Sequence, residues 1–245
     1  MKLQLVFSAI ALAAASLTAT AAELPKPDAD GWISLFNGAD LTGWEGLPGY
    51  WSVADGTIQC KETKATSKQS DLILSASKAS PEKFANFELH YSWRMVSPGG
   101  NSGVQIRSVI DRPDMLHAGG YQADIDAKNN YTGIIYCEGA AAGGRGIMSN
   151  RGEKTLWDEN NKRSSTKFEK TGDELKKAIK SQGGWNDCVV VANGTRITYT
   201  INGVLMTDMT DNSPKGRKDG VIALQMHAGF DMTIEFKDFK IKMLP

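Results

Sequence analysis

Three alternating stretches of the chain carry polar side chains of mixed type on one face. They are "SGVQIR", "GGYQADID" and "GVIALQMH". Carboxylates are depleted in strands, so an aspartate within such a pattern needs a reason. Amide, carboxylate, guanidinium and imidazole groups together predict a concave surface that binds a polar ligand. The residues are Gln105 and Arg107, Gln122 and Asp124, and Gln225 and His227.

A simpler interpretation is that these residues only face water, because one face of an antiparallel sheet is often solvated. Their repetition on three strands favours a site. Asp126, one residue pair beyond Asp124, is expected at the strand end, where solvation or a turn explains it. The intervening residues are expected to pack inward; they are Tyr121, Ala123 and Ile125.

The elements that position these residues are expected to be short strands. "NFELHYSWRMV" alternates apolar and polar residues with period two, as a half-buried strand does. Asn193-Gly194 and Asn202-Gly203 separate β-rich runs and predict a three-stranded meander. The alternation changes phase near Lys237-Asp238, which predicts a β-bulge in the last strand.

The only helix expected lies in "TGDELKKAIKS", where Thr171 and Glu174 form a capping box. No alternation of strand and helix appears. The pattern predicts an all-β protein, a jelly-roll sandwich of two antiparallel sheets with one short helix.

The composition indicates a single exported domain. The 245 residues have a formal net charge of zero, which gives no sign of a nucleic-acid partner. Lys2, the apolar run over 3–17 and the small residues Ala19 and Ala21 predict a signal peptide over residues 1–21. Residues 22–245 are then one domain in the periplasm or outside the cell, with no membrane contact after cleavage.

Several kinds of site are excluded by spacing. "DIDAKNN" lacks the glycine and the glutamate that an EF-hand requires, and no G-x-S-x-G elbow occurs. The three histidines have no metal-ligand spacing. No cofactor is assigned, although a divalent metal ion stays open, as does the oligomeric state. Buried free thiols are expected for the cysteines, with at most one disulfide; they are Cys60, Cys137 and Cys188.

An ordered set of motifs resembles the 3-keto-disaccharide hydrolase family, formerly a domain of unknown function. The motifs are "GWISLFNGADLTGW", "NSGVQIR", "GYQADID", "YTGIIYCE", "GRGIMSNRGEK", "GVIALQMHAG" and "FKDFKIKML", over roughly residues 30–244. Where the family has an acidic pair after "YTGIIY", this chain has Cys137 and Glu138, and "GAAAGG" lengthens the next loop. The resemblance implies a concanavalin A-like lectin/glucanase fold and a small oxidised glycoside as the substrate.

The resemblance also implies 1,2-lyase and hydratase chemistry on 3-keto-glucosides. A ketone at C3 acidifies the C2 proton, so a base removes it, the C1 substituent leaves and water adds back. Asp124 or His227 is the expected base, and Glu138 is the expected acid for the leaving oxygen. Arg107 is expected to hold the enolate oxygen.

The remaining site residues are expected to bind the sugar. The residues expected to bind hydroxyl groups are Gln105, Gln122 and Gln225. Those expected to stack on the sugar ring are Trp44, Tyr131 and Trp185. Arg145, which follows the lengthened loop, is also expected to bind the sugar. Tryptophan in a sandwich is more often part of the core. The alternatives are a carbohydrate-binding lectin domain without catalysis and a purely structural sandwich. An enzyme requires Asp124, His227 and Arg107 in one pocket.

Overall fold

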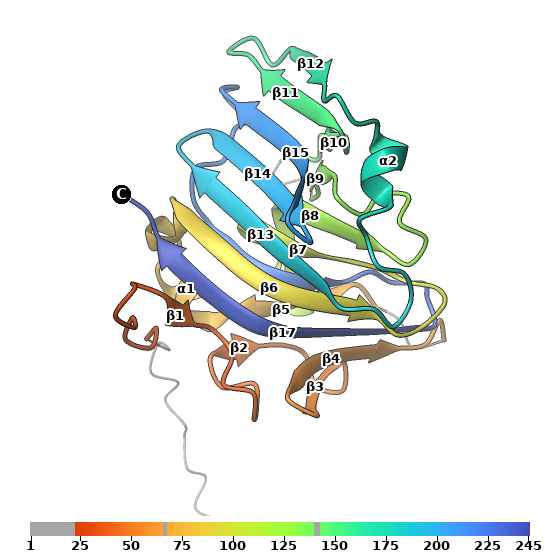
Figure 1. Cartoon of the computed structure of the whole chain (residues 1–245). Coiled ribbons are helices and arrows are strands. Elements are labelled where there is room, and N and C mark those ends of the chain that lie inside the picture. Colours follow the sequence, from red (N-terminus) through yellow and green to blue (C-terminus); the bar gives the residue numbers. More distant parts are fainter. Residues whose placement is uncertain (1–22, 66–67, 140–142) are drawn as a thin grey trace, which may run out of the picture.

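The computed structural model describes residues 23–65, 68–139 and 143–245. The predicted signal peptide lies outside the described residues, as does part of the "GAAAGG" loop. Two β-sheets pack face to face, and the larger sheet is in front in Figure 1. The predicted all-β sandwich is confirmed. No helix among the described residues has both the length and the apolar character that a bilayer crossing requires.

The larger sheet has ten strands in the order β12-β11-β15-β14-β13-β6-β17-β4-β3, with β1 beside β17. All its pairs are antiparallel except β11 with β15, which is parallel and departs from the purely antiparallel prediction. Its strands are β1 (Ile33–Ser34), β3 (Trp51–Ala54), β4 (Thr57–Glu62), β6 (Phe87–Met95), β11 (Glu153–Trp157), β12 (Arg163–Lys167), β13 (Asn186–Asn193), β14 (Arg196–Ile201), β15 (Val204–Asp211) and β17 (Met232–Met243).

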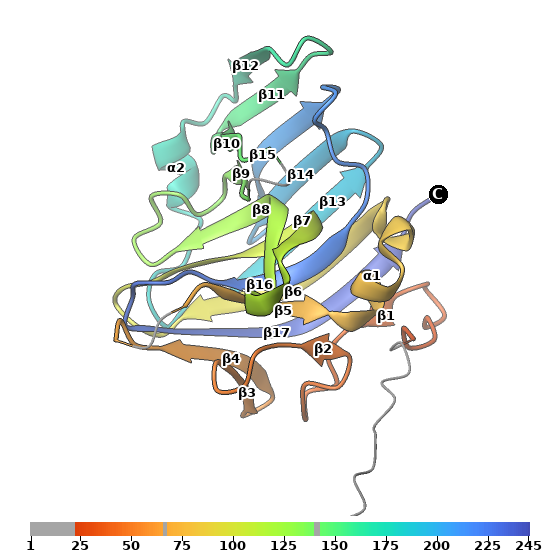
Figure 2. The same ribbon diagram turned by 180° about the vertical axis from the view of Figure 1, so that it is seen from behind.

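The smaller sheet has seven strands in the order β10-β9-β8-β7-β16-β5-β2. Figure 2 views it from the front, with β7, β8 and β16 before the larger sheet. Its strands are β2 (Trp44–Glu45), β5 (Ser70–Leu74), β7 (Asn101–Arg112), β8 (His117–Asp126), β9 (Ile135–Cys137), β10 (Gly146–Ser149) and β16 (Val221–Met226).

The alternation read from the sequence places the core between the sheets. The apolar faces of β6, β7, β8 and β16 are buried in one hydrophobic cluster, and the three cysteines are buried thiols outside any disulfide. The Asn-Gly meander forms as β13, β14 and β15, and β17 shifts register between Lys237 and Lys240, which confirms the predicted bulge. Both predictions rest on local backbone rules, which is why they hold.

The predicted helix forms as α2 (Gly172–Lys176), and Thr171 and Glu174 make the reciprocal capping box. The expectation of a single helix is wrong, because the structure has a second short helix, α1 (Ser75–Ala79). Two one-turn 3₁₀ segments are also present, η1 (Pro81–Phe84) and η2 (Pro113–Met115). α1 has no side-chain N-cap and only five residues, so it carries no capping signal.

The far end of the β7–β8 hairpin folds over the outer face of the smaller sheet. The register of the pair shifts twice, after Ile106 and after Ile110. Leu116 and Ala118 pack there on Ile73, in a small apolar cluster separate from the main core. Gly120 permits the bend, because a Cβ at this position would lie 2.2 Å from Ser108 Oγ. The fold-over brings residues from the hairpin end close to the polar face.

Candidate active site

The polar residues of β7, β8 and β16 share the outer face of the smaller sheet. In the β7–β8 pair, Gln105 lies opposite Gln122, and Gly103 lies opposite Asp124. Gln225 pairs with Gly103 from the other side. The inward residues of β8 are buried in the core, as expected. Side chains far apart in sequence therefore meet on one surface.

A cavity of about 320 Å³ opens on this surface. Small-molecule sites commonly measure about 300–1,000 Å³, so a small ligand fits. Six of its lining residues come from the eleven site candidates of the sequence analysis, and Asn101, Tyr136 and Ile147 are additional. The lining consists of Asn101, Gln122, Asp124, Tyr131, Tyr136, Glu138, Ile147, Gln225 and His227.

Gln122 links the floor of the cavity to Asp124. Its Oε1 accepts from Gln105 Nε2 at 2.6 Å, and its Nε2 donates to Asp124 Oδ1 at 3.2 Å. Gly103 makes room for this side chain, because a Cβ there would lie 2.5 Å from Gln122 Cγ. Gln105 is completely buried, so it supports the cavity from beneath and is not one of its lining residues.

The carboxyl group of Asp124 has a pKa near neutral pH. Asp124 is only 5% exposed. In addition to the bond from Gln122, its Oδ1 accepts a hydrogen bond from the backbone N–H of Ile125 at 2.9 Å. Burial, assisted by the negative charges of Asp126 and Glu138, raises the pKa of Asp124 to about 7. A group with this pKa accepts and releases protons near neutral pH, as general acid–base catalysis requires.

Glu138 is held by donors on both oxygens. Oε1 accepts from Gln69 Nε2 at 2.6 Å, while Oε2 accepts from Gln105 Nε2 at 3.2 Å and from Gln225 Nε2. Burial acts to raise the pKa of Glu138, but hydrogen bonds from His117 and Gln69 and the nearby histidine charges hold it below its usual value. Glu138 is therefore an anion at neutral pH and a poor proton donor, contrary to the role expected from the resemblance.

His117 and Asp111 complete this side of the site, and sequence reasoning missed both. His117 Nε2 lies 3.7 Å from Glu138 Oε1, and Nδ1 contacts Asp111 Oδ1. Burial acts to lower the pKa of His117, but Glu138 and Asp111 raise it above its ordinary value. The His117 ring therefore lies between two carboxyl groups, which favour its protonated form. Only the fold-over of the β7–β8 hairpin brings His117 to Glu138, so no local pattern predicts it.

His227 faces the cavity beyond the end of β16. Its Nδ1 lies 2.8 Å from the carbonyl oxygen of Ala228. A carbonyl oxygen only accepts, so Nδ1 carries the hydrogen and Nε2 is the nitrogen available to a ligand. Neutral His227 accepts a proton at Nε2, and the protonated ring donates one from the same atom.

Asp126 shapes the loop that carries Tyr131 to the cavity. It ends β8, and Oδ1 accepts from the backbone N–H groups of Tyr131 at 2.7 Å and Thr132 at 3.0 Å. The predicted turn explanation for Asp126 is thus confirmed. Tyr131 is half exposed at the rim. Burial raises the pKa of Tyr136, so its hydroxyl stays a neutral donor.

Arg107 does not reach the cavity, and the expectation that it shares the face of Gln105 is wrong. The register shift after Ile106 and a φ of 46° at Arg107 turn its side chain away. Its guanidinium donates to the carbonyl oxygens of Ala85 at 2.9 Å and Gly194 at 2.8 Å. Arg107 therefore ties the two sheets together at one end of the sandwich.

Arg145 is also held elsewhere. Its guanidinium pairs with Asp211, donates to Ser213 Oγ at 3.0 Å and lies over the ring of Trp157. Burial acts to lower the pKa of Arg145, but Asp211 raises it. These contacts hold the guanidinium inside the fold, so Arg145 does not line the cavity.

The two tryptophans expected to stack on a sugar also lie away from the cavity. Trp44 is buried in the core, where its Nε1 donates to the carbonyl oxygen of Leu35 at 2.7 Å. Arg94 and Lys237 lie over the Trp185 ring at 4.8 Å and 4.6 Å from its centroid. Trp44 is therefore a core residue, whereas Trp185 is a partly buried residue covered by two cationic side chains.

A metal centre is not apparent in residues 23–65, 68–139 and 143–245, where no group of three or more His, Cys, Asp or Glu residues could hold a metal ion.

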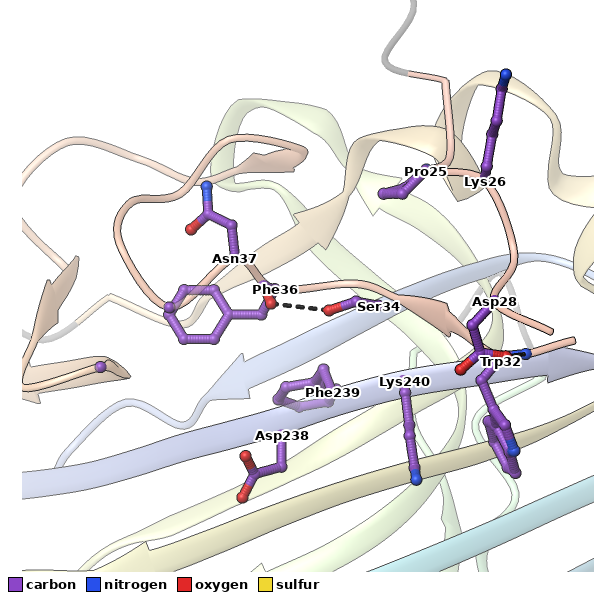
Figure 3. Close-up of a pocket in the computed structure, with 12 residues that line it drawn as sticks. Pro25, Lys26, Asp28, Trp32, Ser34, Phe36, Asn37, Asp238, Phe239 and Lys240 are labelled. Atoms are coloured by element: carbon purple, nitrogen blue, oxygen red, sulfur yellow. Dashed lines mark hydrogen bonds between the residues drawn. The ribbon is translucent and has the colours of Figure 1, made fainter. Parts of the chain in front are cut away.

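A second, more open hollow of about 670 Å³ lies outside the larger sheet, beside β1 and β17 (Figure 3). Lys240 Nζ lies 4.8 Å from the centroid of the Trp32 ring, and His90 packs on the same ring at 4.5 Å. Ser34 Oγ donates to the carbonyl oxygen of Phe36 at 3.0 Å. The hollow lacks the convergent acid and imidazole groups of the first cavity, so the first cavity is the candidate active site.

Comparison with known proteins shows the family to which the chain belongs. The family model described as "3-keto-alpha-glucoside-1,2-lyase-like domain" matches residues 31–242. A 3-keto-disaccharide hydrolase from Bacteroides thetaiotaomicron is 38% identical over 86 residues, which cover 31% of this chain and 27% of that protein. The match thus spans about a quarter of the curated relative.

Solved structures share the fold. A candidate glycosyl hydrolase from Parabacteroides distasonis has a TM-score of 0.56 at 20% identity, covering 89% of this chain and 95% of its own. The carbohydrate-binding module CBM66 from Bacillus subtilis has a TM-score of 0.52 at 16% identity, covering 81% and 94%. A Bacillus subtilis protein of unknown function with a galectin-like fold has a TM-score of 0.50 at 9% identity, covering 83% and 90%.

Proposed function

The chain belongs to the family of 3-keto-alpha-glucoside-1,2-lyase-like domains, and from this membership we propose that it cleaves 3-keto-glucosides at the bond to C1. The observation that carries the proposal is one cavity containing a carboxyl group with a pKa of about 7, Asp124, and an imidazole, His227. Elimination beside a ketone needs one group to take a proton and another to give one.

In the proposed reaction, ionised Asp124 takes the C2 proton of the sugar. The electrons of the C2–H bond form the enolate of the C3 ketone. When the ketone re-forms, C1 and C2 become doubly bonded, the bond from C1 to the glycosidic oxygen breaks, and protonated His227 gives that oxygen its proton. The product is a 3-keto-2-hydroxyglucal.

Hydration restores both groups. Neutral His227 takes a proton from water as its oxygen bonds to C1, and protonated Asp124 returns a proton to C2. The sum is hydrolysis of the glycosidic bond. Gln122 and Gln225 are the proposed partners of sugar hydroxyls. The neutral hydroxyl of Tyr136 replaces Arg107 as the proposed donor to the enolate oxygen, because it lines the cavity.

The test uses a 3-keto disaccharide and the parent disaccharide as a matched control. We expect enone absorbance and free sugar from the 3-keto substrate, and no cleavage of the parent, whose C2 proton is not acidic. Equal cleavage of both, or of neither, contradicts the proposal.

A second candidate function is carbohydrate binding without catalysis. The observation in its favour is that neither lysine nor arginine lines the cavity in the described part of the chain, so the cation expected at the enolate oxygen is missing. A lectin-like domain would bind the parent disaccharide in calorimetry and leave both sugars intact.

We also propose that the protein is exported, on the basis of its apolar N-terminal run and the Ala19-x-Ala21 site. The mature chain is expected to begin at Ala22 or Glu23. Mass spectrometry of the protein recovered from the periplasm or medium checks this, and an intact Met1 there contradicts it.

A further inference from the structure

Asp71 is a completely buried carboxyl group next to the active site that the proposed reaction does not use. It lies on β5, directly opposite Gln225 of β16 in an antiparallel pair. Opposite residues point to the same face, with Cβ atoms about 4.5–5.5 Å apart. The side chains of Asp71 and Gln225 are therefore neighbours on the outer face of the smaller sheet.

Each residue of this pair has a buried oxygen without a hydrogen-bond partner among the described residues. They are Asp71 Oδ1 and Gln225 Oε1. The other atom of each group is engaged: Asp71 Oδ2 accepts from the backbone N–H of Ala118 at 2.7 Å, and Gln225 Nε2 donates to Glu138 Oε2. The bond to anionic Glu138 fixes the orientation of the Gln225 amide, so its oxygen must face the other way.

Two acceptors cannot bond to each other, and leaving a buried acceptor without a partner destabilises the folded protein. A proton on one of the two oxygens gives both of them a hydrogen-bond partner. We propose that Asp71 is a carboxylic acid protonated on Oδ1, which donates to Gln225 Oε1 and thereby positions the amide that holds Glu138. Asp71 is then a positioning residue, and the chain of contacts runs from Asp71 through Gln225 to Glu138.

The surroundings of Asp71 favour the neutral form. Burial is the main cause that raises its pKa to about 8, and the charge of Glu138 raises it further. The backbone N–H of Ala118, the His117 ring and, to a smaller extent, the backbone N–H of Met226 oppose the shift. Another ionisable neighbour is the Cys60 thiol on β4, whose own pKa is raised by burial first and then by Glu62 and Asp71. Asp71 and Glu138 thus differ in protonation at neutral pH because their hydrogen-bond partners differ.

The proton on Asp71 is inferred from contacts alone, whereas its effect on turnover rests on the proposed function. The two are separated by measuring the proton directly. In wild-type protein near pH 6, infrared spectroscopy is expected to show the carbonyl stretch of a buried carboxylic acid that is missing in Asp71→Asn. Asp124→Asn serves as the matched control, because Asp124 is the other acid with a raised pKa.

Asp71→Asn is the conservative variant, because an asparagine amide still donates to Gln225 Oε1 and its oxygen still accepts from Ala118 N–H. It is expected to fold and to keep turnover within about threefold of wild type. Asp71→Leu keeps the volume but has no donor, and turnover is expected to fall at least tenfold while the 3-keto specificity is unchanged.

Stability measured against pH gives a second readout. Folded Asp71 keeps its proton from its unfolded pKa near 4 up to about 8, so wild type loses stability as pH rises through this window and then levels off. The unfolding constant of wild type relative to Asp71→Asn is expected to rise up to tenfold per pH unit between pH 5 and pH 8. A ratio independent of pH, no acid carbonyl band attributable to Asp71, or loss of activity in Asp71→Asn equal to that in Asp71→Leu would overturn the proposal.

Discussion

Asp124→Asn is expected to lower turnover of a 3-keto disaccharide by roughly 10²–10⁴-fold, the contribution typical of a general base. The amide keeps the shape of the carboxyl group and its hydrogen bond from the Ile125 N–H, but it accepts no proton from C2. Substrate binding is expected to change far less than turnover. Initial rates at several substrate concentrations separate the two effects.

The same variant is expected to be at least as stable as wild type at pH 8. The pKa of folded Asp124 is raised to about 7, so the folded protein binds a proton that the unfolded chain has lost, and wild type loses stability as pH rises to about 7. Asparagine removes this loss. Denaturant unfolding at pH 5 and pH 8 measures the difference, which should favour the variant more at pH 8.

The wild-type pH profile provides an independent check. Because the base must be ionised, the acidic limb of the kcat/KM profile is expected to rise with pH up to about 7. Asp208→Asn is the matched control: Asp208 is also a strand aspartate 5% exposed, but it pairs with Arg196 on the other sheet. If Asp124→Asn folds and keeps the activity of this control, Asp124 is not the base.

Glu138→Gln is expected to destabilise the protein by about 1–3 kcal/mol, the cost of leaving a buried donor unsatisfied. The carboxylate now accepts from Gln69, Gln105 and Gln225, and a glutamine amide would place its own donors against at least one of them. Loss of the anion also removes one of the two carboxylate partners of His117 and leaves Asp111 as the other. Chemical denaturation at pH 7 measures this cost.

A second result distinguishes electrostatics from simple loss of structure. The charge of Glu138 helps to raise the pKa of Asp124, so in Glu138→Gln the rising limb of the kcat/KM profile should move to lower pH. Glu235→Gln is a suitable control, because Glu235 is a buried carboxylate bonded to Gln59 and Arg94 on the larger sheet. An unshifted limb in Glu138→Gln would show that Glu138 does not act on Asp124.

The strand pattern alone determined which side of β8 faces the core. Period-two alternation put Tyr121, Ala123 and Ile125 inside and left Gln122 and Asp124 on the outer face. The Asn-Gly turns, the capping box of α2 and the bulge of β17 were equally predictable. Each depends on a few neighbouring residues and their backbone preferences, so the sequence contains all the information needed.

Tertiary structure decided which polar groups meet and what charge each carries. Arg107 follows the alternation of β7 in sequence, yet a bulge turns it into the sandwich, where backbone carbonyls bind it. His117 reaches Glu138 because the hairpin end folds over the sheet, and Asp71 lies beside Gln225 because β5 pairs with β16. Burial and the partners contributed by distant strands set the protonation of these groups. Neither burial nor such partners can be read from the local spacing of residues in the sequence.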